Sequence, residues 1–96
     1  MPRPDVDSEH QVEAAERRER LALLSPGGSP DRAIRVTSAA VIEVRAAAMP
    51  CPQCSGQYRV LEHTRPVPGL RQVDVACRYC GVPRTLWFRL VDNEPN

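Results

Sequence analysis

Four cysteines form two matched pairs in the second half of this 96-residue chain. Two residues separate the cysteines of each pair, and 22 residues separate one pair from the other. Two cysteines at this spacing can bend a tight turn so that both sulfur atoms face one ion, and two such turns supply the four thiolates that structural zinc sites prefer. The sequence therefore predicts one structural Zn²⁺ ion with four ligands: Cys51, Cys54, Cys77 and Cys80.

The same cysteines allow other chemistry. Cys-x-x-Cys pairs can form disulfides or act as redox dithiols, and a rubredoxin-like iron site uses the same four ligands. Residues 1–31 carry seven acids against four arginines, where a secretory signal would carry basic residues and an apolar run. We therefore expect a cytoplasmic protein, in which thiols stay reduced and paired cysteines more often bind metal. Zinc is favoured over iron because nothing else in the sequence indicates electron transfer.

A catalytic role for the metal is not expected. Catalytic zinc keeps a position open for water, whereas four thiolates close the coordination shell. His63 falls at the end of the predicted hairpin that is remote from the cysteines, and His10 falls in the acidic N-terminal segment. The body of the chain offers no plausible Ser-His-Asp triad or paired carboxylates. The sequence thus predicts a protein that is not an enzyme.

A β-hairpin must bring the two cysteine pairs together. Residues 57–64 and 70–77 are predicted strands, and the prolines and glycine of residues 65–69, RPVPG, suit a loop between antiparallel strands. A hairpin that closes symmetrically about this loop would have the cross-strand pairs Gln57–Cys77, Arg59–Val75 and Leu61–Val73. A third strand is predicted over residues 84–91, with an inward stripe of Leu86, Phe88 and Leu90.

Glycines favour the turns that the cysteines require. Gly81 directly follows Cys80 and permits a left-handed turn, so that backbone N–H groups can point at the thiolates. Ser55 occupies the corresponding position after Cys54, and Gly56 comes one residue later. Either Ser55 adopts the left-handed conformation, or Gly56 provides the turn one residue later.

The motifs C-P-Q-C and C-R-Y-C-G, each followed by a strand, resemble the two knuckles of zinc-ribbon proteins. The resemblance covers residues 50–91 and is local. It implies a three-stranded antiparallel sheet held by one zinc ion with four cysteine ligands. Zinc ribbons serve in transcription machinery, ribosomal proteins and multi-subunit enzymes, so the resemblance indicates a metal and a fold rather than one role.

The first half of the chain adds weaker elements. Ser8 and Gln11 form a capping box that predicts a marginal helix over residues 8–24, and SPGGSP at residues 25–30 ends it. Residues 33–49 are rich in β-branched residues and predict one or two short strands, although the alanines at 46–48 allow a helical turn.

The predicted fold class is therefore a small β protein. Residues 1–30 form a charged, partly disordered N-terminal tail with a possible helix over residues 8–24. Residues 31–91 form a three-stranded antiparallel zinc ribbon with one or two added N-terminal strands. The metal core spans residues 50–91, and residues 92–96 form a C-terminal tail.

Charge and aromatic residues bear on the partner. Residues 50–91 carry six arginines against two acids, a net charge of +4, and the chain has no lysine, which is typical of GC-rich bacterial genes. We expect a protein-interaction or scaffold module of a multi-subunit or regulatory assembly. A nucleic-acid-binding ribbon is the alternative, with arginines on phosphates and aromatic rings on bases. The candidate contact residues are Trp87, Tyr79, Arg59, Arg71, Arg78, Arg84 and Arg89. No apolar run approaches the ~20 residues that cross a bilayer, so a membrane partner is not expected.

Overall fold

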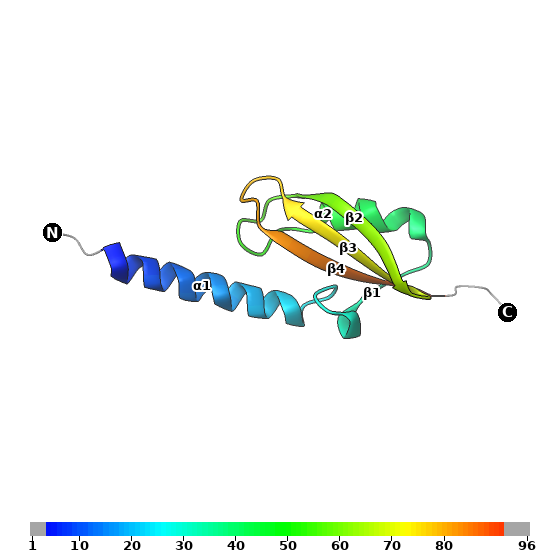
Figure 1. The fold of residues 1–96 in the computed structure, drawn as a ribbon, viewed down its shortest axis with the longest axis horizontal. Coiled ribbons are helices and arrows are strands. Elements are labelled where there is room, and N and C mark those ends of the chain that lie inside the picture. Colours follow the sequence, from blue (N-terminus) through cyan, green and yellow to red (C-terminus); the bar gives the residue numbers. More distant parts are fainter. Residues whose placement is uncertain (1–3, 92–96) are drawn as a thin grey trace.

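A four-stranded mixed sheet forms the centre of the protein (Figure 1). The computed structural model describes residues 4–91, with side chains described from residue 11 onward. The sheet order is β1-β4-β3-β2, and the strands span Ile34–Val36 (β1), Tyr58–Val67 (β2), Leu70–Cys77 (β3) and Pro83–Leu90 (β4). Two α-helices, α1 (Pro4–Leu24) and α2 (Ile42–Ala48), and two short 3-10 turns at Pro30–Arg32 and Ala39–Val41 complete a small, mostly-β fold. The predicted tail at residues 92–96 lies outside the described residues.

Strand β1 makes the sheet mixed. The three longer strands are antiparallel to their neighbours, whereas β1 pairs in parallel with the end of β4, with Ile34 opposite Phe88 and Val36 opposite Leu90. One of the one or two added N-terminal strands that the sequence predicts therefore forms, but it makes the sheet four-stranded and mixed rather than a three-stranded antiparallel ribbon. Apolar alternation in β1 explains its position, because it buries Val36 beside Phe88 in the core. The predicted inward stripe of β4 is confirmed.

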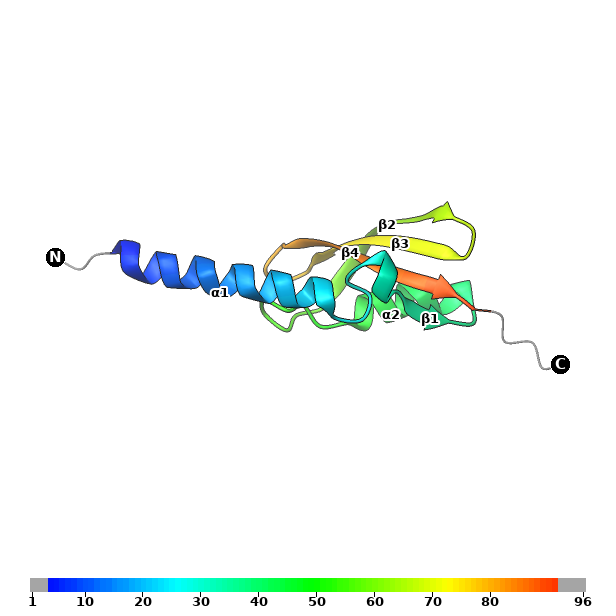
Figure 2. The ribbon, with the colours of Figure 1, turned by 90° about the horizontal axis from the view of Figure 1, so that it is seen from below.

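A second N-terminal strand does not form, because residues 42–48 are the helix α2. Ile42 and Ala46 lie four residues apart and are both fully buried, while the three residues between them are exposed. The run of three alanines also favours helix over strand. The preceding 3-10 turn begins where the Ser38 hydroxyl accepts a hydrogen bond from the Ala40 N–H. Helix α2 packs against β2 and β3 and covers one side of the sheet (Figure 2).

The β2–β3 hairpin differs in register from the symmetric prediction. Tyr58, rather than Gln57, lies opposite Cys77. A bulge at Leu61 then shifts the register again, so that His63 rather than Leu61 pairs with Val73. All three predicted pairs, Gln57–Cys77, Arg59–Val75 and Leu61–Val73, are wrong.

The hairpin turn is also shorter than predicted. Strand β2 continues to Val67, and the turn contains only Pro68 and Gly69, whose φ of +82° suits glycine. A shift of one residue exchanges the two faces of a strand. Tyr58 therefore points into the core, whereas Arg59 is exposed.

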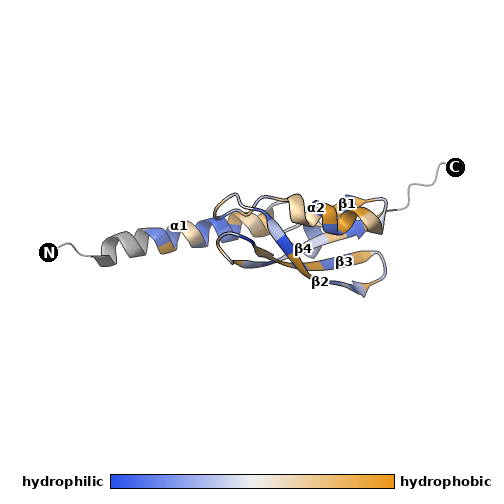
Figure 3. Cartoon of the chain, turned by 90° about the horizontal axis from the view of Figure 1, so that it is seen from above, coloured by the Kyte–Doolittle hydropathy of each residue, from blue (hydrophilic) through white to orange (hydrophobic). Residues whose placement is uncertain are grey.

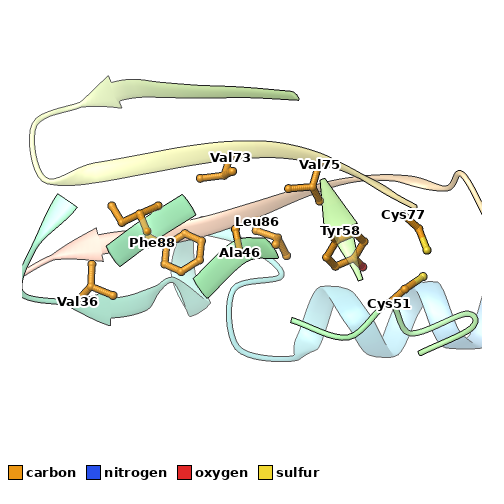
Figure 4. Close-up of a cluster of buried hydrophobic side chains, with 10 residues drawn as sticks. Val36, Ala46, Cys51, Tyr58, Val73, Val75, Cys77, Leu86 and Phe88 are labelled. Atoms are coloured by element: carbon orange, nitrogen blue, oxygen red, sulfur yellow. The ribbon is translucent and has the colours of Figure 1, made fainter. Parts of the chain in front are cut away.

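The apolar core and the cysteines form one packed cluster. Figure 4 shows the cluster extending from Val36 at one end, past Phe88 and Leu86, to Cys51 and Cys77 at the other. Its buried members are Val36, Ile42, Ala46, Cys51, Tyr58, Val73, Val75, Cys77, Leu86 and Phe88. Figure 3 shows the apolar residues concentrated in β1, α2 and the other strands, while α1 is mixed. The geometry of the cysteine end therefore depends on the same packing that holds the sheet.

Helix α1 lies beside the sheet and projects beyond its cysteine end (Figures 1 and 2). It begins at Pro4, four residues before the predicted start, so Ser8 is inside the helix and is not its cap; the side chain of Ser8 lies outside the described part. The helix ends at Leu24 as predicted. Gly28 is required at this end, because a Cβ there would lie 2.0 Å from the carbonyl oxygen of Ala22.

Within residues 4–91, no helix combines the length and apolar content needed to cross a bilayer.

A matched pair of leucine substitutions tests the placement of the core. Leu86 is 3% exposed, whereas Leu61, at the β2 bulge, is 52% exposed. We expect Leu86→Ala to lower the free energy of unfolding by about 2–5 kcal/mol, because it leaves a cavity. Leu61→Ala should change it by less than about 0.5 kcal/mol. Urea unfolding of both variants measures the difference, and equal losses would contradict the sheet faces described here.

Candidate metal centre

The first cysteine turn, Cys51–Gly56, is closed by two backbone hydrogen bonds. The Ser55 N–H donates to the Cys51 carbonyl at 2.7 Å, and the Cys51 N–H donates to the Gly56 carbonyl at 2.9 Å. Pro52 follows the first cysteine and restricts the turn at its start. These bonds fix the direction in which the backbone enters β2.

The second turn, Cys77–Val82, has the same backbone pattern. The Gly81 N–H donates to the Cys77 carbonyl at 3.1 Å, and the Cys77 N–H donates to the Val82 carbonyl at 3.0 Å. In each turn the first cysteine bonds to the residues four and five positions later. The two turns, named here the first and second knuckles, are therefore equivalent in backbone structure.

The residue after the second cysteine of each knuckle has a left-handed backbone. Gly81 has φ = +77° and Ser55 has φ = +63°. Serine rarely adopts this conformation, which costs a residue with a Cβ about 1–2 kcal/mol. The sequence allows two arrangements of the first knuckle, and the structure shows the one in which Ser55 itself is left-handed. The first knuckle therefore closes in the same way as the second, where Gly81 has this conformation.

The four sulfur atoms converge on one point between the knuckles. All four Sγ atoms lie within 4.8 Å of one another. Two of the pairs join one knuckle to the other, Cys54–Cys77 at 3.4 Å and Cys51–Cys80 at 3.7 Å, and all four cysteines are free of disulfides. Sulfur atoms bound at about 2.3 Å to one tetrahedral zinc ion lie about 3.8 Å apart. The donor set therefore fits a single ion of this size and geometry.

Gly56 makes room for this convergence. A Cβ at Gly56 would lie 3.1 Å from the Cys77 sulfur, 3.2 Å from the Cys54 sulfur and 2.4 Å from the Tyr79 ring. The sequence places a glycine here without indicating its purpose. Its role is close approach between the knuckles, since its neighbour Ser55 provides the left-handed turn.

Backbone N–H groups favour the thiolate at Cys77. The Cys80 and Tyr79 N–H groups lie 3.5 Å and 3.4 Å from the Cys77 sulfur, and they lower the pKa of that thiol to about 6. The Val82 N–H acts in the same direction on Cys80. Burial and the three neighbouring sulfur atoms outweigh it there and raise the pKa of the Cys80 thiol to about 12. Negative charges on sulfur atoms this close repel one another, and a nearby cation would offset that repulsion.

His63 has its own partners away from the cysteines. Its Nδ1 lies 3.2 Å from a carboxylate oxygen of Glu43 on α2, and Arg71 Nη1 lies 3.3 Å from its Nε2. Arginine can only donate, so Nε2 accepts and the proton of the neutral ring is on Nδ1, where it is donated to Glu43. His63 thus links α2 to the hairpin. Arg71, a predicted contact residue, is used within the fold, and its buried Nε has no hydrogen-bond partner among the described residues.

Arg84, another predicted contact residue, also bonds within the chain. Its side chain is 11% exposed; Nη2 donates to the Glu19 carboxylate of α1, with Oε1 at 3.0 Å, and Nε donates to the Tyr58 hydroxyl at 2.8 Å. Burial raises the pKa of Tyr58 to about 12, although Arg84 opposes the shift. The neutral Tyr58 hydroxyl therefore holds Arg84 in position beside the first knuckle.

Gln53, between the first two cysteines, contacts helix α1. Its amide donates to the Ala15 carbonyl at 3.0 Å, and its oxygen accepts a bond from Arg18 Nε at 3.1 Å. The sequence does not predict this contact, because the residues that bond are 35 and 38 positions apart and carry no shared pattern. The knuckle and the helix are thus joined directly.

The remaining predicted contact residues are mostly at the surface. Tyr79, at the tip of the second knuckle, is 75% exposed, and Arg59, Arg78 and Arg89 are exposed as well. Trp87 is partly buried. The backbone N–H of Trp87 donates to the Gly27 carbonyl at 2.8 Å, so the segment at residues 25–30 lies beside this part of β4.

Comparison with known proteins adds no relative. No protein-family model, no curated protein and no solved structure matches this chain.

The two knuckle turns can be tested by reciprocal substitutions. A Cβ at Gly81 would meet nothing within 4 Å, so Gly81→Ala introduces only the cost of a left-handed backbone. We expect it to lower the free energy of unfolding by about 1 kcal/mol. Ser55→Gly should raise it by about 0.5–1 kcal/mol, because it relieves the same cost in the first knuckle. Thermal and urea unfolding measure both, and destabilisation by Ser55→Gly would contradict the described turn.

Proposed function

We propose that the four cysteines hold one structural zinc ion and that the stabilised domain acts as a protein-interaction or scaffold module. The convergence of four sulfur atoms from two equivalent knuckles carries the first half of this proposal. Four thiolates fill a tetrahedral shell and leave no position for water or substrate. The site therefore supports stability rather than catalysis, and we propose no enzymatic activity.

The resemblance to zinc ribbons supports zinc. The first knuckle leads into β2, and the second joins the end of β3 to the start of β4, which is the arrangement that the resemblance implies. The parallel strand β1 and helix α2 are additions to that pattern. When bound, the ion would neutralise the thiolates of Cys51, Cys54, Cys77 and Cys80, and the N–H groups of Tyr79 and Cys80 would orient the Cys77 sulfur.

The size and surface of the domain support an interaction role. The strand β2 lies at a free edge of the sheet and exposes Leu61 and Val67. An edge of this kind is a template for pairing with another chain. Two of the candidate arginines, Arg71 and Arg84, are engaged inside the fold, which leaves fewer cations for phosphates.

Nucleic-acid binding is the second candidate, because Tyr79 is the most exposed aromatic residue of the described part and has Arg78 beside it. A ring in this position can stack on a base while the arginine contacts a phosphate. A redox dithiol is a lesser alternative, since sulfur atoms 3.4 Å apart are close enough to react after small movements.

Metal content tests the structural site. We expect native mass spectrometry to find one zinc per chain, and we expect Cys54→Ser to lose most of it, because three thiolates bind zinc far more weakly. Removal of zinc by a chelator should abolish cooperative unfolding, since binding free energy at structural sites is largely folding free energy. Ser55→Ala, in the same knuckle, keeps all four thiols and should keep one zinc. Bound iron, or a metal-free chain that unfolds like the untreated protein, would contradict the proposal.

Salt-dependent binding separates the two roles. We expect no binding to a 20-nucleotide single strand or duplex tighter than about 1 μM at physiological salt, because net-basic surfaces this small bind nucleic acid only weakly. Fluorescence anisotropy across a salt series provides the measurement. Tighter binding that weakens with salt and is lost in Tyr79→Ala and Arg78→Ala, while zinc content is unchanged, would favour the nucleic-acid role instead.

A further inference from the structure

The first half of β4 has one unpaired edge. On the side away from β3, β1 pairs only with residues from Phe88 to Leu90. The Trp87 N–H donates to Gly27 on this side, and the Val91 N–H donates to Val36. N–H groups alternate between the two edges of a strand, so the Thr85 N–H and carbonyl also point to this side. Among residues 4–91, the backbone bonds at this edge join Trp87 to Gly27, residues 88–90 to β1 and Val91 to Val36, and none of them involves Thr85.

A groove follows this unpaired edge. Its volume is about 1030 Å³, and five consecutive residues of β4, from Pro83 to Trp87, form one wall. Helix α1 forms the opposite wall with Leu21, and Ile34 and Met49 add apolar surface. The Glu19–Arg84 ion pair and the Gly27–Trp87 hydrogen bond connect α1 and its linker to β4. The groove is therefore a built feature of the fold rather than a loose gap.

The groove is basic as well as apolar. Three arginines line it, Arg18, Arg45 and Arg84, against one acid, Glu19, for a net charge of +2. Arg84 and Glu19 form an ion pair with each other, so the net positive charge of the groove comes from Arg18 and Arg45. The chemistry of the wall thus favours apolar side chains accompanied by carboxylates.

We propose that an extended segment of a partner protein, carrying apolar and acidic side chains, binds in this groove by adding a strand beside Thr85 of β4. The peptide backbone would accept a hydrogen bond from the Thr85 N–H and donate one to the Thr85 carbonyl, as in other complexes that extend a sheet. Its apolar side chains would contact Trp87 and Met49, and its carboxylate would face Arg45. This inference rests on the proposed interaction role and specifies the partner and the mode of binding.

Selection of peptides on the zinc-loaded full chain provides the test. A random library of displayed 12-residue peptides is the probe, and titration of the single Trp87 fluorescence measures affinity for the enriched sequences. We expect enrichment of acidic peptides that contain apolar residues. Thr85→Pro removes the free N–H and breaks no backbone bond within the fold, so it should weaken binding about tenfold. Arg45→Glu should weaken binding further, because it replaces a positive charge that lines the groove by a negative one, which repels the acidic peptide.

Thr85→Ala is the matched control. Both Thr85 substitutions lose the hydroxyl bond to Asp74, but alanine keeps the N–H, so its affinity should stay within about twofold of the original. N-methyl scanning of the enriched peptide gives a readout that does not depend on the folding of Thr85→Pro. Methylation of the one peptide N–H that donates to the Thr85 carbonyl should weaken binding about tenfold, whereas methylation at other positions should have a smaller effect.

Three results of these binding experiments would overturn the inference. They are no enrichment above background, equal binding by Thr85→Pro and Thr85→Ala, and tolerance of N-methyl groups at every position. A chain that dimerises in solution, and becomes monomeric in Thr85→Pro, would show that a second copy takes the edge instead. If Thr85→Pro still binds a partner protein, the general interaction role stands but this site is excluded. If the unmodified chain contains no zinc, the proposed function itself is wrong.

Discussion

Repulsion among four closely spaced sulfur atoms is the constraint on which the rest of the structure depends. The Sγ atoms lie within 4.8 Å of one another at the end of the apolar core, and two of the cysteines, Cys51 and Cys77, are buried members of that core. Thiolates this close repel one another, and a cation between them converts the repulsion into attraction. The core holds β2, β3 and β4 at the spacing that closes the cluster, so packing positions the four ligands, and an ion bound there would in turn stabilise a domain too small to rely on packing alone.

The parts of the fold that sequence predicts correctly are set by local chemistry. Cysteine spacing, the Gly81 turn and the alternation of Leu86, Phe88 and Leu90 each express a constraint within a few residues. The errors arise where local rules compete. The alanines at 46–48 favour helix while Val41, Ile42 and Val44 favour strand, and burial of Ile42 with Ala46 decides for the helix. The predicted hairpin register fails because the turn is Pro68–Gly69 rather than residues 65–69, and register shifts at two places in β2 change the pairing further.

Contacts between distant segments could not be predicted. The Glu19–Arg84 ion pair joins residues 65 positions apart, and Gln53 meets the Ala15 carbonyl across 38. Each of these polar side chains could equally well be exposed to water. Which of them forms an interaction within the protein is decided by the tertiary structure, and the local sequence carries no signal for it. The predicted partner-contact residues therefore include arginines that are exposed at the surface, such as Arg78, and arginines that form ion pairs within the fold, such as Arg84.

The two hydrogen bonds of the Gln53 side chain connect the first knuckle to helix α1. Because this residue sits between Cys51 and Cys54, its orientation follows that of the sulfur atoms on either side. The half of α1 before Ala15 extends beyond the sheet for about 15 Å at the rise of an α-helix. Since Gln53 bonds to both Ala15 and Arg18, any displacement of the first knuckle would be transmitted to α1 at this point.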